Sequence, residues 1–155
     1  MGGERGFWRG GNGELSRAVE LSAQAKNGET MNLVKDKYRG APKYFYVMAE
    51  LVRAAQYRGI TTYQDLAVIM GLPQKGSHMG REIGHVLGEI VEDELAADRP
   101  MLSAVAVSVN GLPGPGFYTL AEELHRLGPD EDKRIFWEAE RDAVYEAWRR
   151  PLPPD

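Results

Sequence analysis

Proline and glycine divide residues 42–120 into short segments, and each segment has a hydrophobic period of its own. Three of these segments repeat apolar residues at helical spacing, which predicts helices over residues 42–59, 63–70 and 81–98. A β-branched stretch at 60–62 suits a short strand, and its last residue, Thr62, is of a type that caps the following helix. Any fold of this chain has to place one short strand among several helices.

Residues 99–118, with the sequence RPMLSAVAVSVNGLPGPGFY, predict a β-hairpin. The run from Met101 to Val109 is rich in β-branched and small apolar residues, and the following NGLPGPG has the composition of a turn. Phe117 and Tyr118 would belong to the returning strand. The expected order is helix, short strand, helix, helix and two-stranded wing, which is the order of a winged helix-turn-helix in the α+β class.

Two flanking segments complete the predicted organisation. Residues 1–41 are expected to form a flexible basic tail with an amphipathic helix at 14–27, and residues 42–120 the winged-helix domain. Residues 121–155 are expected to contain a C-terminal helix, because acidic residues precede its apolar stripe and arginines follow it. The apolar stripe of this helix is expected to pack on the winged-helix domain. The sequence therefore predicts one compact domain between two flanking helical segments.

The composition excludes several kinds of site. The chain has no cysteine, so it forms neither a disulfide nor a thiolate zinc site and has no cysteine nucleophile. No apolar run reaches the roughly 20 residues that span a bilayer, and the first residues lack the apolar core of a signal peptide. We therefore expect a soluble, cytoplasmic protein without a membrane partner.

Charge is distributed unevenly along the chain. Residues 1–43 carry eight Lys or Arg against five Asp or Glu, whereas residues 44–155 carry 11 against 18. Duplex DNA binders usually present a basic face, because counterion release supplies much of their affinity. A nucleic-acid contact is therefore expected at a local basic cluster, aided by an N-terminal arm that contains Arg5, Arg9, Arg17, Lys35, Lys37, Arg39 and Lys43.

Three short motifs within residues 42–120 resemble the alkylguanine-DNA alkyltransferases and their alkyltransferase-like relatives. The motifs are Thr61-Thr62-Tyr63 with Leu66 and Ala67, then Arg81 with Ile83 and Gly84, and finally Pro100 followed by the glycine-rich stretch Gly111–Tyr118. The resemblance implies a winged helix that binds the minor groove of DNA through its recognition helix. It also implies that Tyr63 helps to rotate a nucleotide out of the duplex and that Arg81 fills the vacated space.

The chain departs from that family at the reactive centre. Where the family has Cys-His-Arg, this chain has Met101-Leu102-Ser103. A thioether cannot become a thiolate nucleophile, and a leucine side chain cannot relay a proton. Alkyl transfer is therefore excluded, and the resemblance leaves a non-enzymatic protein without a cofactor.

The predicted DNA-binding residues gather around the start of one helix and are Tyr63, Lys75, Ser77, His78 and Arg81. Basic side chains and the unpaired amide groups of a helix start both favour a phosphate group. His78, Glu82 and His85 also fall on one helical stripe, which leaves a metal site as an alternative, although the HExxH spacing is absent. We assign no metal to this stripe, because the same pattern describes a solvated helix face.

Three functions follow from these patterns. The favoured hypothesis is a non-enzymatic winged-helix protein that binds DNA. The second is a winged-helix module that binds a protein partner or another copy of itself, which the acidic middle and C-terminal parts favour. The third is a metal-dependent enzyme built on His78, Glu82 and His85. Salt-dependent DNA binding would support the first, a concentration-dependent mass or a co-purifying protein the second, and stoichiometric zinc or manganese the third.

Overall fold

The computed structural model describes residues 36–151. The predicted helix at 14–27 and the part of the predicted basic arm before residue 36 lie outside the described residues. The described elements, in chain order, are α3 (Pro42–Gln56), β1 (Thr61–Thr62), α4 (Tyr63–Met70), α5 (Gly76–Ala96), the 3₁₀ helix η1 (Leu102–Val105), β2 (Ala106–Val107), α6 (Pro115–Glu123) and α7 (Lys133–Ala147).

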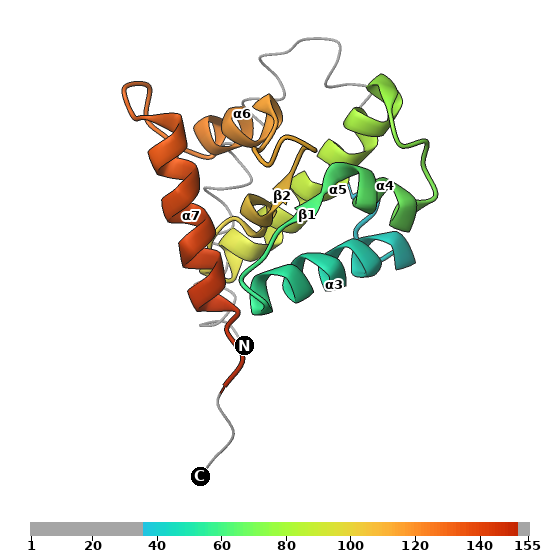
Figure 1. The fold of residues 1–155 in the computed structure, drawn as a ribbon, viewed down its shortest axis with the longest axis horizontal. Helices are drawn as coiled ribbons and strands as arrows, with labels where there is room; N and C mark the ends of the chain where they lie inside the picture. The colour runs from blue at the N-terminus through green and yellow to red at the C-terminus, as the bar shows by residue number, and fades with distance from the viewer. Residues whose placement is uncertain (1–35, 152–155) are drawn as a thin grey trace, which may run out of the picture.

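The fold is α+β and mostly helical, so the predicted class is confirmed. The two strands form a small parallel sheet, in which Thr61 lies opposite Ala106 and Thr62 opposite Val107. Figure 1 shows this sheet at the centre, with α3 below it, α6 above it and α7 at one side. Among the described helices, none has the length and apolar character needed to cross a membrane.

The predicted hairpin at residues 99–118 is wrong, and a winged-helix fold is not confirmed. Strand β2 is only two residues long and pairs with β1, and Phe117 and Tyr118 lie within helix α6. Pro115 starts that helix, because its fixed φ and missing N–H suit the first helical turn, so the Gly-Pro pair that suggested a turn is a helix start. Residues 101–107 are all buried at the centre of the fold, where a continuous apolar run is expected instead of the alternation of a surface hairpin.

The central segment of residues 101–107 is held in place by α7. The indole Nε1–H of Trp137 donates a hydrogen bond of 2.8 Å to the Ala104 carbonyl. The buried carboxylate of Glu140 accepts the Met101 N–H at 2.9 Å. The segment η1 also packs against α3 and α5, so it is enclosed by three helices that come from distant parts of the sequence.

Helix α5 does not present the solvated acidic face that its sequence suggests. Glu82 and Glu89 are buried and accept hydrogen bonds from residues that precede α3. The Tyr38 N–H donates to Glu89 at 3.0 Å, and the Tyr38 hydroxyl donates to Glu82. Arg39 extends the contact, because its guanidinium lies 3.1 Å from Asp93. These carboxylates hold residues 36–39 against α5, and Lys37, Arg39 and Arg99 each form an ion pair with a carboxylate of the helix.

Candidate functional site

The start of α5 carries four of the five predicted DNA-binding residues. Helix α4 ends at Gly71, and a short connection leads to Lys75 and into α5. Lys75, Ser77, His78 and Arg81 are all exposed. The sequence predicts this helix over residues 81–98, but α5 begins at Gly76, so Ser77 and His78 lie in its first turn.

The amide groups in the first turn of α5 have no side-chain cap. Lys75, at the cap position, makes no such hydrogen bond, and the first turn contains no acidic residue. By comparison, α4 is capped by the Thr62 hydroxyl, and α7 by the Asp132 carboxylate. The positive end of the α5 dipole is thus left to solvent or to an anionic ligand.

The charges of Lys75 and Arg81 are not neutralised within the described part of the chain. Among residues 36–151, most cationic side chains form ion pairs, and examples are Lys37, Arg39, Arg53, Arg58, Arg99, Arg126, Arg134 and Arg141. Neither Lys75 nor Arg81 pairs with a carboxylate of these residues. Both cations therefore lie beside an uncapped helix start without a described counter-charge.

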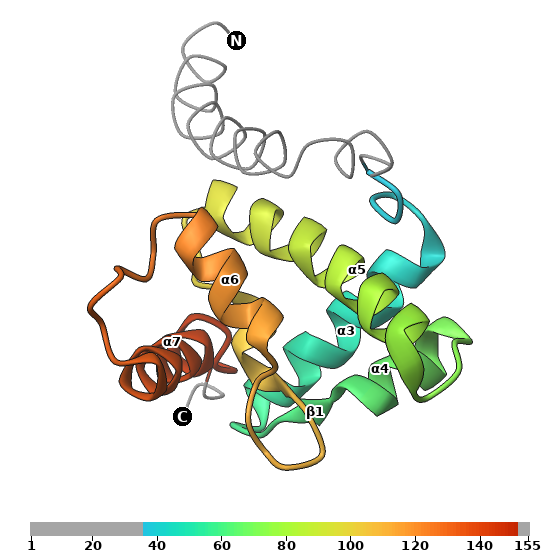
Figure 2. The same ribbon diagram turned by 90° about the horizontal axis from the view of Figure 1, so that it is seen from above.

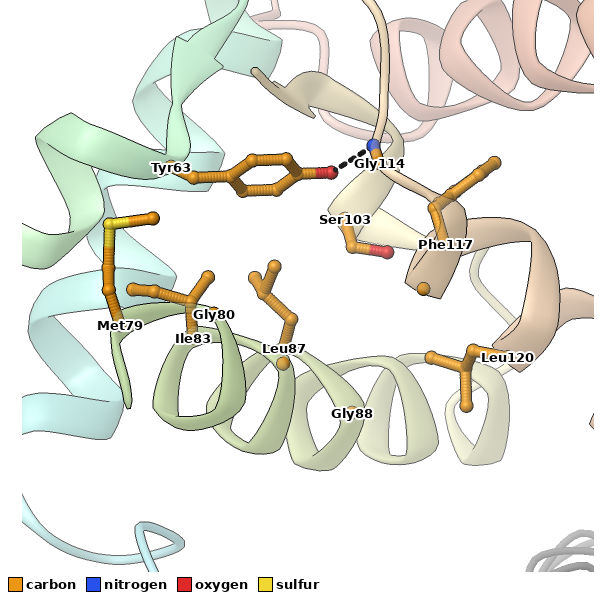
Figure 3. Close-up of a pocket in the computed structure, with 12 residues that line it drawn as sticks. Tyr63, Met79, Gly80, Ile83, Leu87, Gly88, Ser103, Gly114, Phe117 and Leu120 are labelled. Carbon is orange, nitrogen blue, oxygen red and sulfur yellow. Dashed lines mark hydrogen bonds between the residues drawn. The ribbon is translucent and has the colours of Figure 1, made fainter. Parts of the chain in front are cut away.

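Tyr63, the fifth predicted residue, does not belong to this exposed group. It is the first residue of α4, and its hydroxyl accepts the Gly114 N–H at 2.9 Å. Burial raises the pKa of Tyr63, so the phenol stays protonated at neutral pH. Its ring lies across a cavity from Met79, as Figure 3 shows, and Met79 follows His78 in α5. Tyr63 thus joins α4 to the connection before α6 and forms one wall of the cavity.

The cavity between α5 and α6 has a volume of about 300 Å³, and sequence analysis did not predict it. Figure 2 shows α6 lying between α5 and α7. Its lining is apolar and rich in glycine, and consists of Tyr63, Met79, Gly80, Ile83, Gly84, Leu87, Gly88, Ser103, Gly114, Gly116, Phe117 and Leu120. The signal available in the sequence was the spacing of four between Gly80, Gly84 and Gly88, which places them on one helix face.

Ser103 is the residue of the Met101-Leu102-Ser103 segment that reaches the cavity. Met101 and Leu102 are fully buried in the core. The Ser103 side chain is 5% exposed, points into the cavity in Figure 3, and has no hydrogen-bond partner among the described residues. The segment that stands in place of the family's reactive motif thus contributes a single buried hydroxyl to this cavity.

The predicted alternative of a metal on His78, Glu82 and His85 finds no support in the described residues. Among them, no group of three or more His, Asp or Glu side chains is placed to hold a metal ion. Glu82 is directed to Lys37 and Tyr38, and the hydrogen bond from Lys37 lowers the pKa of Glu82. The His85 ring lies 3.3 Å from the Glu89 carboxylate. The helical stripe is therefore divided between two separate contacts.

Comparison with known proteins adds nothing to this geometry, because no family model, curated protein or solved structure matches the chain. The resemblance to the alkyltransferase-like proteins thus stays a prediction from short motifs. A functional conclusion has to be drawn from the arrangement of residues 36–151 alone.

Proposed function

We propose that the protein binds DNA without catalysing a reaction, and that the first two turns of α5 contact the phosphate backbone. The observation that carries this proposal is the coincidence of an uncapped helix start with two cations, Lys75 and Arg81, that no described carboxylate neutralises. Oriented amide groups and basic side chains together are a common phosphate-binding arrangement. Ser77 and His78 add two exposed polar groups to the same turn.

The position of α5 relative to α4 supports the same proposal. The two helices are joined by the short connection Gly71–Lys75 and pack against each other, as in a helix-turn-helix unit. Thr62 caps α4, and the Tyr63 ring anchors its start. In this proposal α5 is the recognition helix of a winged-helix relative, and Tyr63 positions the unit instead of contacting DNA itself.

The neutralisation of the acidic side chains favours an approach of DNA to this end. Glu82 forms an ion pair with Lys37, and Asp93 forms one with Arg39, so these carboxylates repel a phosphate less than their number suggests. The affinity should still be modest and salt-dependent, because only a few cations lie at the tip of the helix.

The test is a fluorescence-anisotropy titration of a labelled DNA duplex at about 50 and 200 mM salt. We expect Lys75→Ala and Arg81→Ala each to weaken binding several-fold and to lower the salt slope by about 1. Arg149→Ala is the matched control, because Arg149 is an exposed cation that follows α7. The end of α7 lies on another side of the molecule from the start of α5 (Figure 1). Equal losses in all three variants would show that binding follows total charge alone, and no binding at low salt would refute the proposal.

A second candidate function, contact with a protein partner or a second copy of the chain, is favoured by α3. Phe45 and Tyr46 are 57% and 60% exposed on this helix, and Tyr57 follows it with 67% exposed. Exposed aromatic side chains are enriched at protein interfaces. A mass that rises with concentration in light scattering, and that falls back in Phe45→Ala with Tyr46→Ala, would support this candidate. A constant monomer mass at all concentrations would exclude self-association.

A further inference from the structure

We propose that the exposed face of α3 binds a second copy of this chain, with the two α3 helices running in opposite directions and crossing at Ala49. This face consists of Phe45, Tyr46, Ala49 and Arg53. The inference rests on the second candidate function, a contact made through α3, and it does not depend on DNA binding. It names the partner of that contact and the side chains that meet in it.

Helix α3 has one buried side and one exposed side. The residues that pack into the core are Tyr44, Val47, Leu51, Ala54 and Ala55. On the other side, Phe45 and Tyr46 are 57% and 60% exposed, and Ala49 is exposed between them and Arg53. Figure 1 shows α3 along the lower edge of the fold and the start of α5 near its upper right. Neighbouring exposed aromatic rings are typical of an interaction surface.

Two side chains of this face are held in place by other residues. The Phe45 ring packs edge to face on the ring of Tyr44, with 5.4 Å between their centroids. The Nε and Nη2 atoms of Arg53 donate to the two carboxylate oxygens of Glu50 at 2.7 and 2.8 Å. This paired geometry orients the flat guanidinium. Side chains that are already ordered lose less entropy on binding, which favours association through them.

The order of residues along α3 makes this face complementary to itself. Phe45 lies four residues before Ala49 and Arg53 four residues after it, so each is about 6 Å from Ala49 along the helix axis. When two copies cross in opposite directions at Ala49, Phe45 of each copy lies opposite Arg53 of the other. A guanidinium over an aromatic ring is a favourable contact, and a two-fold axis forms it twice.

Ala49 allows the two helices to approach each other closely. Because Phe45, Ala49 and Arg53 recur at a spacing of four, they form one ridge on the surface of α3. Helices that pack through such ridges cross at about 50°, with their axes about 8–10 Å apart. A methyl group at the crossing point permits the short end of this range, whereas a longer side chain would hold the helices apart.

The charges of the face favour a second copy as its occupant. The chain has a formal net charge of −4, so two copies repel each other in most orientations. On the exposed face of α3, however, Arg53 is paired with Glu50, and Phe45, Tyr46 and Ala49 are uncharged. A two-fold contact places identical surfaces together, so a face whose charges are balanced avoids repulsion between like charges.

The first test uses the absence of cysteine from the chain. In Ala49→Cys two thiols would meet at the two-fold axis, within the Cα separation of about 4.4–6.8 Å that a disulfide requires. We expect mild oxidation to link this variant into dimers about tenfold faster than Ala143→Cys, because association raises the effective concentration of the paired thiols. Ala143 is an exposed residue of α7, outside the proposed face. Equal rates for the two variants would overturn the crossing at Ala49.

Sedimentation of the full chain over a range of concentrations measures the association itself. The mass of the unchanged protein should rise towards that of two chains. Ala49→Glu should weaken this association by more than about tenfold, because two carboxylates would meet at the two-fold axis, and Ala143→Glu should leave it unchanged. Glutamate favours helices, so both variants should fold, which circular dichroism checks. Normal association of Ala49→Glu would overturn the interface.

A double-mutant comparison tests the contact between Phe45 and Arg53. We expect Phe45→Ala and Arg53→Ala each to weaken association about fivefold, and the double variant to be hardly weaker than Phe45→Ala, because both changes remove the same contacts. Additive losses would overturn this pairing. Arg81→Ala should associate like the unchanged protein, even where it weakens DNA binding. A monomer mass at every concentration would overturn self-association altogether, whereas association without linkage at Ala49→Cys would overturn this inference alone.

Discussion

At the scale of single residues, buried carboxylates connect parts of the chain that are distant in sequence. Glu140 of α7 accepts the Met101 N–H at 2.9 Å and the Arg126 guanidinium at 2.7 Å. One side chain thereby joins α7, the central segment and the residues after α6. Because the Oε2 atom of this buried carboxylate accepts both contacts, its loss should leave both donors without this partner.

We expect Glu140→Ala to lower the free energy of unfolding by about 2 kcal/mol, since it leaves the buried Met101 N–H without a partner and removes the ion-pair partner of the partly exposed Arg126. Urea unfolding followed by circular dichroism measures this change. Glu138→Ala, two residues earlier, removes a carboxylate that lies 3.4 Å from Arg134 at the surface, and should change stability by less than about 0.5 kcal/mol. Similar effects in both variants would contradict the role assigned to Glu140.

Glu82 should make the stability of the protein depend on acid pH. The hydrogen bond from Lys37, and then that from Tyr38, lowers the pKa of Glu82 from its ordinary value of 4.5. A carboxyl group with a lowered pKa in the folded state contributes stability above about pH 4.5, and this stability is lost as the pH falls through the lowered pKa.

In Glu82→Gln the loss of stability between pH 5 and pH 3 should be shallower than in the unchanged protein, and stability at pH 7 should be lower. Unfolding by urea at four pH values tests this expectation. Glu122→Gln, an exposed carboxylate in α6, should leave the acid dependence as it is. An unchanged acid dependence in Glu82→Gln would show that other groups account for it.

At the scale of elements, the helices with both a start and a stop signal were predictable. The predicted helix at 63–70 is confirmed as α4, because Thr62 caps it and Gly71 ends it in a left-handed conformation. The helix predicted from Pro42 is confirmed as α3, although it ends at Gln56, three residues before the predicted stop at Gly59. Local sequence signals were enough to predict these two helices, because the start and the end of a helix each depend on a few neighbouring residues.

The element that sequence could not predict is the one whose environment is set by distant residues. The run at 101–107 has the composition of a strand, yet η1 occupies most of it and β2 only its end. Its contacts with Trp137 and Glu140 of α7 come from over 30 residues away, and no local pattern reveals them. The same limit applies to the candidate site. The polar residues before position 81 were predicted to lie at a helix start, but α5 begins earlier, at Gly76. The cavity required α6 in place of the expected wing.

The cap of helix α4 can be tested by substitution. This helix is the first of the two helices in the proposed DNA-binding unit. The Thr62 hydroxyl accepts the Asp65 N–H at 3.1 Å. We expect Thr62→Ala to lower the free energy of unfolding by about 1 kcal/mol, and Thr62→Ser to have little effect, because serine caps a helix start equally well. Thermal unfolding of the two variants distinguishes a cap from a packing role, since loss in both would indicate that the threonine methyl group matters.

At the scale of the whole molecule, different parts of α5 make different contacts. The start of the helix is exposed and basic, whereas its middle and end bind the segment 36–39 through carboxylates. This division explains how an overall acidic chain can still present a local basic tip. It also makes the residues before α3 part of the folded body, because Tyr38 is only 8% exposed.

Tyr38 should therefore contribute far more to stability than a tyrosine on the outer face of α3. Tyr38 packs edge to face on His85 and donates its hydroxyl to Glu82, and burial together with Glu82 raises its pKa to about 12. We expect Tyr38→Ala to cost about 3 kcal/mol in urea unfolding, because it removes a buried aromatic ring and leaves Glu82 with fewer partners. Tyr46→Ala, at a position 60% exposed, should cost less than about 0.5 kcal/mol. If both variants unfold like the unchanged protein, residues 36–39 do not fasten α5, and the carboxylates of that helix face solvent, where they would oppose DNA binding.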